Sequence, residues 1–282
     1  MLIPFGTMWA GMHTARSMRE EDDIVAHERA VRFLSKHFVS LYWTDPASTL
    51  EKFVHDAYSA FVISVAGKWR LITAGHILGP IDRALKRGDK LDGWFLDDGW
   101  SLEGKRDEPV PFDLAGAKRR VVGETSNDYG VIHIDGDTAR RLADNHIVAG
   151  DESVWEPAWP AHFDGFSVLG LPTKGIELLP NGNMSKMVMS FPVTRIMTRP
   201  EYFRPVDVQR FYGEIKRDAV TESQLRDFDG MSGGPIFGFQ QVDDSLRYWI
   251  VAVQTESLMP KRMISGCYLE PLIRALKAGT IG

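Results

Sequence analysis

The spacing of apolar residues changes near residue 57, which separates an N-terminal segment from the rest of the chain. In that segment one apolar stripe at helical spacing predicts an amphipathic helix over residues 19–39, formed by Ile24, Val31, Leu34 and Phe38. The acidic run 20–23 precedes most of this stripe, where a helix dipole favours negative charge. We expect the helix to pack on the main body, and the sequence leaves open that a regulatory partner docks on it.

From residue 57 onward, short apolar runs alternate with clusters of Gly, Pro, Asn and Asp. Residues 61–65 and 69–73 predict two strands joined by a short turn that contains Gly67. Further strands are predicted at 94–96, 118–122, 129–134, 166–169, 187–192, 235–239 and 248–255. Many short strands with such punctuation favour an all-β barrel or sandwich over alternating βα units.

The predicted strands fall into two groups. The prolines of residues 155–160 break both helices and strand ladders, so we place a boundary between two β units near residue 145. The predicted organisation is an N-terminal extension (1–55), a first β unit (56–145) and a second β unit (146–282). A closing helix is expected over residues 269–278, with Gly279 as its stop.

The charge balance and the terminal sequence narrow the class of protein. The formal net charge is −5, which argues against a nucleic-acid binder because phosphate binding needs a clustered positive field. The N-terminus lacks the basic leader of a signal peptide, and no apolar stretch reaches the length of a membrane span. We expect a cytoplasmic protein that binds neither nucleic acid nor membrane.

The chain has a single cysteine, Cys267, so no disulfide can form within it. A lone thiol favours a reducing compartment or a fold that needs no covalent staple. Because Cys267 stands in a β-like stretch just before the closing helix, we expect a buried core residue and not a reactive thiol.

The strongest candidate for chemistry is the segment Gly230-Met231-Ser232-Gly233-Gly234-Pro235. A serine hydroxyl is a poor nucleophile, so an enzyme must aim it, deprotonate it and stabilise the oxyanion that it creates. Gly230 can adopt backbone angles that are barred to other residues, which would let its N–H and that of Ser232 point to one place. The segment therefore predicts a nucleophilic serine with an oxyanion hole.

Two further segments supply a base and an acid. His76 ends the apolar strand that includes Thr73 and Ala74, and histidine accepts a proton near neutral pH with the least adjustment. Asp128 stands at the start of the apolar run 129–134, where a carboxylate can orient an imidazole tautomer. Each segment is weak evidence alone, but the three together predict a catalytic triad of His76, Asp128 and Ser232.

The order of these residues excludes one alternative. The segment around Ser232 also fits the G-x-S-x-G elbow of α/β-hydrolases, in which the histidine follows the serine. All eight histidines of this chain precede Ser232, and the β-rich pattern does not suit that fold. The elbow interpretation is therefore rejected.

The order His, Asp, Ser and the three motifs resemble those of the trypsin-like (chymotrypsin-fold) serine proteases, over residues 57 to the C-terminal helix. The resemblance implies two six-stranded antiparallel β-barrels, here with an N-terminal helical extension and a C-terminal helix. It implies that Ser232 attacks the scissile carbonyl, that His76 shuttles the proton and that Asp128 orients His76. The N–H groups of Gly230 and Ser232 would form the oxyanion hole, and no cofactor or metal is required.

The same resemblance suggests where a peptide substrate binds. The segment 250–255 resembles the strand that lines the specificity pocket, so Val253, Gln254 and Thr255 are candidate substrate-binding residues, although an ordinary core strand is equally consistent with the pattern. The pocket floor often lies six residues before the nucleophile, which here is Arg226. A cation there would favour an acidic side chain before the cut bond, although a solvated arginine fits equally well.

One departure from the family concerns activation. Digestive members carry an acid immediately before the serine, and it binds a newly cut N-terminus. Here that residue is Met231, which cannot form an ion pair, so activation by that route is not expected.

Two other functions remain consistent with the sequence. The chain can be a catalytically silent module that binds peptides on a protease fold, or an esterase that uses the same triad. The intact triad argues against the silent module, because a protein without catalytic activity is under no pressure to keep all three groups. The sequence does not exclude the esterase.

Overall fold

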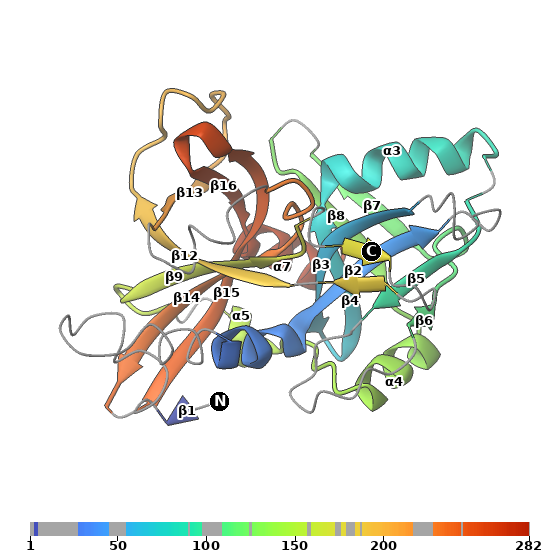
Figure 1. The fold of residues 1–282 in the computed structure, drawn as a ribbon, viewed down its shortest axis with the longest axis horizontal. Coiled ribbons are helices and arrows are strands. Elements are labelled where there is room, and N and C mark those ends of the chain that lie inside the picture. Colours follow the sequence, from blue (N-terminus) through green and yellow to red (C-terminus); the bar gives the residue numbers. More distant parts are fainter. Residues whose placement is uncertain are drawn as a thin grey trace.

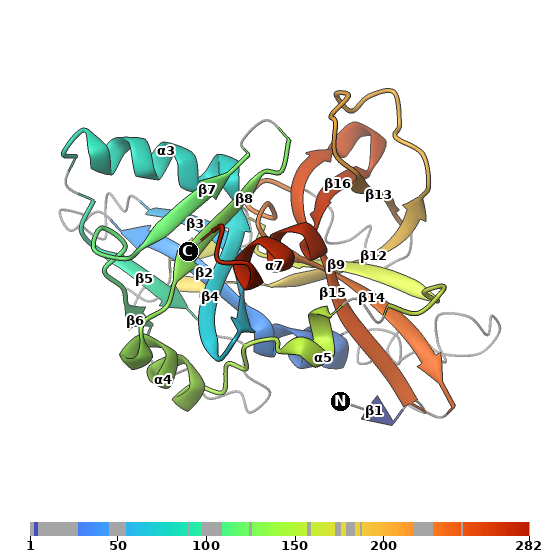
Figure 2. The same ribbon diagram turned by 180° about the vertical axis from the view of Figure 1, so that it is seen from behind.

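The computed structural model describes residues 3–4, 28–44, 55–89, 91–97, 109–123, 126–156, 159–172, 176–178, 184–186, 188–216, 228–243 and 245–281. These residues form two β units that lie side by side (Figure 1). Helix α7 (Leu269–Lys277), near the C-terminus, lies between the two units, as the view from behind shows (Figure 2).

The first unit is an antiparallel sheet. Its strands are β2 (Phe38–Thr44), β3 (His55–Val65), β4 (Lys68–Ala74), β5 (Trp94–Asp97), β6 (Val110–Pro111), β7 (Arg119–Val122) and β8 (Tyr129–His133). They are ordered β6-β5-β2-β3-β4-β8-β7. Among the described residues the two outer strands, β6 and β7, are not paired with each other. One of them contains Pro111, which has no backbone donor and suits an edge.

The second unit is a closed barrel. Its strands are β9 (Gly165–Gly170), β12 (Met189–Ile196), β13 (Arg210–Ile215), β14 (Pro235–Val242), β15 (Ser245–Leu258) and β16 (Met263–Tyr268). They run in the order β15-β14-β9-β12-β13-β16, and β16 pairs with β15 to close the ring. The short strand β1 (Ile3–Pro4) adds to β15, and β10 (Ile176–Leu178) pairs with β11 (Met184–Lys186) as a separate hairpin. The predominantly β fold and one six-stranded barrel are thus confirmed, whereas the first unit has seven strands and its predicted closure into a six-stranded barrel is not found among the described residues.

The N-terminal helix differs from its prediction at the C-terminal end. Residues 28–34 are helical and Ser35–His37 form a 3-10 turn, η2, but β2 begins at Phe38. The prediction that the helix continues to Val39 is wrong, because the segment 38–44 pairs with β3 on one side and β5 on the other. Residues 38–44, which the sequence placed in the N-terminal extension, therefore belong to the first sheet. The predicted start of the helix lies outside the described residues.

The remaining helices are short. They are α3 (Gly75–Lys86), α4 (Gly136–Asp144), α5 (Glu152–Trp155) and the 3-10 turn η4 (Met259–Lys261). The predicted closing helix is confirmed as α7, and it is followed by Gly279 with φ +68°, a left-handed conformation that suits a helix stop. Over the part of the chain that the structure describes, no helix has both the length and the apolar character to cross a membrane.

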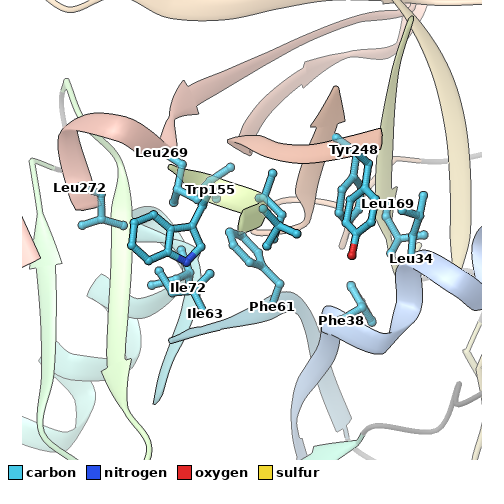
Figure 3. Packing of buried hydrophobic residues seen from close by; sticks show 14 of the residues in the cluster. Leu34, Phe38, Phe61, Ile63, Ile72, Trp155, Leu169, Tyr248, Leu269 and Leu272 are labelled. Carbon is cyan, nitrogen blue, oxygen red and sulfur yellow. The ribbon is translucent and has the colours of Figure 1, made fainter. Parts of the chain in front are cut away.

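A shared apolar core joins the two units (Figure 3). Phe61, Ile63 and Ile72 of the first sheet lie in one cluster with Trp155 of α5 and with Leu169 of the barrel strand β9. Each of these five side chains is at most 1% exposed. Burial of one such side chain contributes roughly 1.5–3 kcal/mol, so this cluster fixes how the units sit against each other.

His37 links the N-terminal segment to the loop before α5 and to the second unit. Its Nδ1 lies 2.5 Å from the carbonyl oxygen of Val148, and its Nε2 lies 2.9 Å from the hydroxyl of Tyr248 on β15. A carbonyl only accepts, so Nδ1 carries the hydrogen and Nε2 accepts from Tyr248. Burial lowers the pKa of His37 to about 4, which keeps the ring neutral.

Cys267 lies on β16 and is 1% exposed. Burial raises the pKa of its thiol to about 11, so the thiolate is not formed near neutral pH. The expectation of a buried core residue is confirmed.

Candidate active site

His76 lies in the first turn of α3, directly after β4. The N-cap residue of this helix, Ala74, has no side chain that can cap it. Asp128 takes that role from another segment: its carbonyl accepts from the N–H of Gly75 at 2.9 Å, and its Oδ1 accepts from the N–H of His76 at 2.7 Å. The carboxylate that satisfies the helix end is thereby fixed beside His76.

The same carboxylate binds the imidazole ring. Oδ2 of Asp128 lies 2.7 Å from Nδ1 of His76, and the side chain of Asp128 is 8% exposed against 47% for that of His76. A carboxylate is an acceptor, so Nδ1 carries the hydrogen and Nε2 is left with a lone pair. A methyl group at Gly75 would lie 2.9 Å from Oδ1 of Asp128, so glycine lets the two segments approach this closely.

Backbone hydrogen bonds hold the loop that carries Ser232 against strand β15. Gly233 N–H donates to the carbonyl of Gln254 at 2.8 Å, and Gln254 N–H donates to the carbonyl of Gly234 at 2.9 Å. Gly230 and Gly233 have φ values of +89° and +93°, which L side chains rarely adopt. Among the described residues, the N–H groups of Gly230 and Ser232 donate to no backbone acceptor.

This loop packs on the end of β4 that leads to His76. A methyl group at Gly233 would lie 2.2 Å from the carbonyl oxygen of Ser59, 2.3 Å from Oγ1 of Thr73 and 3.1 Å from the nitrogen of Ala74. Gly233 follows Ser232 directly, and Ala74 is two residues before His76. The predicted nucleophile and the predicted base therefore stand on segments in direct contact, although they come from different β units.

Ser59 makes a second connection between the units. Its hydroxyl donates to the carbonyl of Gly230 at 2.6 Å and accepts from the N–H of Leu171 at 2.8 Å. Its own carbonyl accepts from the hydroxyl of Thr73 at 2.9 Å. Ser59 was not among the predicted site residues, because it stands two residues before the predicted strand 61–65 and in none of the three motifs.

The residues on both sides of Asp128 are bonded to the barrel. Arg210 on β13 donates from Nη2 to the carbonyl of Ser126 at 3.0 Å, and the hydroxyl of Tyr129 donates to the carbonyl of Tyr268. Nη1 of Arg210 lies 3.9 Å from a carboxylate oxygen of Glu256. These contacts were not predicted from the sequence either, because they join residues far apart along the chain.

The candidate substrate-binding residues lie on β15 beside the loop of Ser232. The residues Val253, Gln254 and Thr255 are at most 5% exposed, so in this structure their side chains do not face solvent. The pairing of β15 with β16 passes from Gln254 to Glu256 and leaves Thr255 in a bulge. Arg226 lies outside the described residues, and Met231 is completely buried.

Within the described ranges, no group of three or more His, Cys, Asp or Glu side chains is arranged to hold a metal ion. The site combines an oriented imidazole and a buried carboxylate with a serine loop in which the N–H groups of Gly230 and Ser232 donate to no backbone acceptor among the described residues. Such a set can transfer a proton and stabilise an oxyanion.

Comparison with known proteins gives structural neighbours only. No protein-family model matches this chain, and no curated protein matches it. Among solved structures, it is similar to the tobacco etch virus protease in complex with product (12% identity, 96% of this chain, 84% of that chain, TM-score 0.44). It is also similar to the thermostable serine protease AL20 from an extremophilic microorganism (14% identity, 87% and 97%, TM-score 0.44). A third is the protease Anisep from Arthrobacter nicotinovorans (16% identity, 83% and 90%, TM-score 0.43). We therefore base the function proposed below on this chain's own residues.

Proposed function

We propose that this protein is a serine endopeptidase of the trypsin-like class, which hydrolyses peptide bonds through His76, Asp128 and Ser232. One observation carries the proposal. The imidazole of His76 is hydrogen-bonded to a buried carboxylate at 2.7 Å, and the residue after Ser232 packs against the end of the strand that leads to this imidazole. A lone serine-containing glycine turn has no need of either feature.

The chemistry follows from the proton positions. Oγ of Ser232 bonds to the carbonyl carbon of the substrate while Nε2 of His76 takes the proton of the Ser232 hydroxyl. Asp128 stabilises the imidazolium that forms. The proton then passes to the leaving amine as the C–N bond breaks, which leaves an acyl-enzyme. Water then attacks the ester carbonyl carbon as His76 takes its proton. The proton passes to Oγ of Ser232 as the C–Oγ bond breaks, which releases the carboxylic acid product and restores Ser232.

The negative charge on the carbonyl oxygen needs donors that are already in place. The N–H groups of Gly230 and Ser232 make no backbone hydrogen bond within the described residues, so both are available for this role. The left-handed conformation at Gly230 is consistent with a backbone turned to present its amide.

Peptide substrates would bind along β15. The side chains of Val253 to Thr255 are buried, so we expect recognition here through the backbone. Arg226 is retained as a proposed selector of acidic side chains before the cut bond. A cleavage profile dominated by Lys, Arg or large apolar residues at that position would eliminate this role.

The test of endopeptidase activity is a proteomic cleavage profile of the purified protein. We expect a set of cleaved peptides that is absent when Ser232→Ala protein is used. Equal profiles for both forms would contradict the proposal and favour the silent binding module. Hydrolysis of simple esters without any peptide cleavage would favour the esterase.

A further inference from the structure

Ser59 is a fully buried residue of β3 in the first unit, and both bonds of its hydroxyl reach the second unit. The hydroxyl donates to the carbonyl of Gly230, the residue at which the loop of Ser232 begins. Its oxygen accepts from the N–H of Leu171, which follows β9. A hydroxyl has one hydrogen to give, so its donor is fully committed to Gly230.

The bond to Gly230 constrains more than one atom. A peptide group is planar, so holding the carbonyl oxygen of Gly230 fixes the plane that it shares with the nitrogen of Met231. Along the chain, the N–H of Gly230 precedes this peptide group and Ser232 follows it. Their directions relative to the first unit therefore depend on the hydroxyl of Ser59.

The backbone of Ser59 acts on the other side of Ser232. Its carbonyl oxygen is the atom that a methyl group at Gly233 would meet at 2.2 Å, and it accepts from Thr73 on the strand that leads to His76. Ser59 thus contacts Gly230 and Gly233, which precede and follow the pair 231–232 along the chain. It also contacts the strand that leads to the proposed base.

We propose that Ser59 is a positioning residue, which holds the loop of Ser232 in register with His76 and keeps the amide of Gly230 directed at the oxyanion. The inference rests on the proposed function. Ser59 is buried and contacts no reacting atom, so it acts through Gly230 and Gly233.

A positioning role and a purely structural one differ in what they change. Loss of a structural bond lowers stability and leaves the reactivity of the folded enzyme unaltered. Loss of a positioning bond lowers the rate of the chemical step while ligand binding is kept, because a misplacement of about 1 Å costs up to ~10²-fold in rate.

The test is the saturation kinetics of a fluorophosphonate probe on the intact protein, in which Ser232 displaces fluoride. For Ser59→Ala we expect the limiting rate of labelling to fall about 10- to 100-fold, with the half-saturating probe concentration changed by less than about threefold. Ser40→Ala is the matched control. Ser40 pairs directly with Ser59 between β2 and β3, is 2% exposed and donates one bond to the carbonyl of Asp97, away from the loop.

Ser59→Cys provides a second variant of nearly the same size, with a weaker donor, and is expected to label at an intermediate rate. It serves the same purpose if Ser59→Ala does not fold. Limiting rates equal to wild type in both Ser59 variants, or an equal loss in Ser40→Ala, would overturn the positioning role and leave the proposed function standing. Failure of the wild-type protein to be labelled at Ser232 would overturn both.

Discussion

The carboxylate of Asp128 accepts two hydrogen bonds from His76, one from its backbone N–H and one from its imidazole ring. Oδ1 accepts from the N–H of His76 and Oδ2 lies 2.7 Å from Nδ1 of the ring. The same carboxylate therefore caps helix α3 and orients the imidazole. The direction of the ring is set by the end of the helix on which it stands, so the proposed base is ordered before any substrate arrives.

Replacement of Asp128 by Asn tests the role of these two hydrogen bonds. The amide keeps the size of the side chain but places an NH₂ group against one of two donors, so the ring loses its acceptor or the helix loses its cap. We expect the rate of Ser232 labelling to fall by about 10³- to 10⁴-fold. Thermal unfolding measured in parallel should show that the variant is folded. A rate within tenfold of wild type would contradict a role for Asp128 in orienting His76.

The contact between Gly233 and Ser59 predicts a large cost for one methyl group. In Gly233→Ala the new group would meet the Ser59 carbonyl oxygen at 2.2 Å at a φ of +93°, so we expect a loss of about 3 kcal/mol or more from strain and overpacking. Gly67→Ala is the control. It also has a positive φ, +70°, but no atom lies within 4 Å, so about 1 kcal/mol is expected. Urea unfolding of both variants measures the difference, and equal losses would argue against this packing.

The features that local signals encode were predicted from the sequence. The hairpin of β3 and β4 was predicted from two apolar runs joined by a short turn that contains Gly67, and in the structure Ala66 and Gly67 both have positive φ. The closing helix was found from its apolar spacing and from Gly279. The motifs also predicted that His76 and Asp128 act together, and the structure places them within hydrogen-bonding distance, while their catalytic role stays a prediction.

The features that depend on tertiary contacts were not predictable in this way. Phe38 falls on the helical stripe of the preceding segment, so the sequence extended the helix to Val39, whereas pairing with β3 and β5 makes residues 38–44 a strand. Ser59 is 171 residues from Gly230, and Arg210 is 84 residues from Ser126. No pattern in a single sequence relates such distant positions.

The burial of His37 predicts a loss of stability in mild acid. Its folded pKa of about 4 lies below the unfolded value of 6.5, so its contribution is complete above pH 6.5 and declines as the pH falls from 6.5 toward 4. At pH 5 this costs about 2 kcal/mol relative to pH 7.5. The carboxylates with lowered pKa values titrate below this window.

Urea unfolding at pH 7.5 and pH 5 of wild type and His37→Gln provides the measurement. The free energy of unfolding of the wild type should fall by about 2 kcal/mol more than that of the variant. The pKa of His133 is also lowered to about 4, but its effect is present in both proteins and cancels in the comparison. Equal losses in both proteins would contradict a buried neutral His37.

Gln254 provides a test of how β15 meets a substrate. Its side chain is completely buried, and neither amide atom has a hydrogen-bond partner among the described residues. Replacement by Met keeps the length and removes two unsatisfied polar atoms, so we expect the free energy of unfolding to rise by about 1 kcal/mol. Gln240→Met, at a half-buried position of β14, should change it by less than about 0.5 kcal/mol.

Labelling kinetics of the same Gln254→Met variant show whether the side chain takes part in binding. With recognition through the backbone, the half-saturating probe concentration should stay within about twofold of wild type. A loss of stability, or a marked loss of probe affinity, would show that the amide of Gln254 has a partner in the working protein.

The most direct test of a triad in this protein is intact-mass analysis after incubation with a fluorophosphonate. We predict one added phosphonyl group, located at Ser232 by peptide mapping, absent in Ser232→Ala and slowed by about 10³-fold or more in His76→Ala. Equal labelling of the wild type and the His76 variant, or attachment at any other residue, would contradict the account.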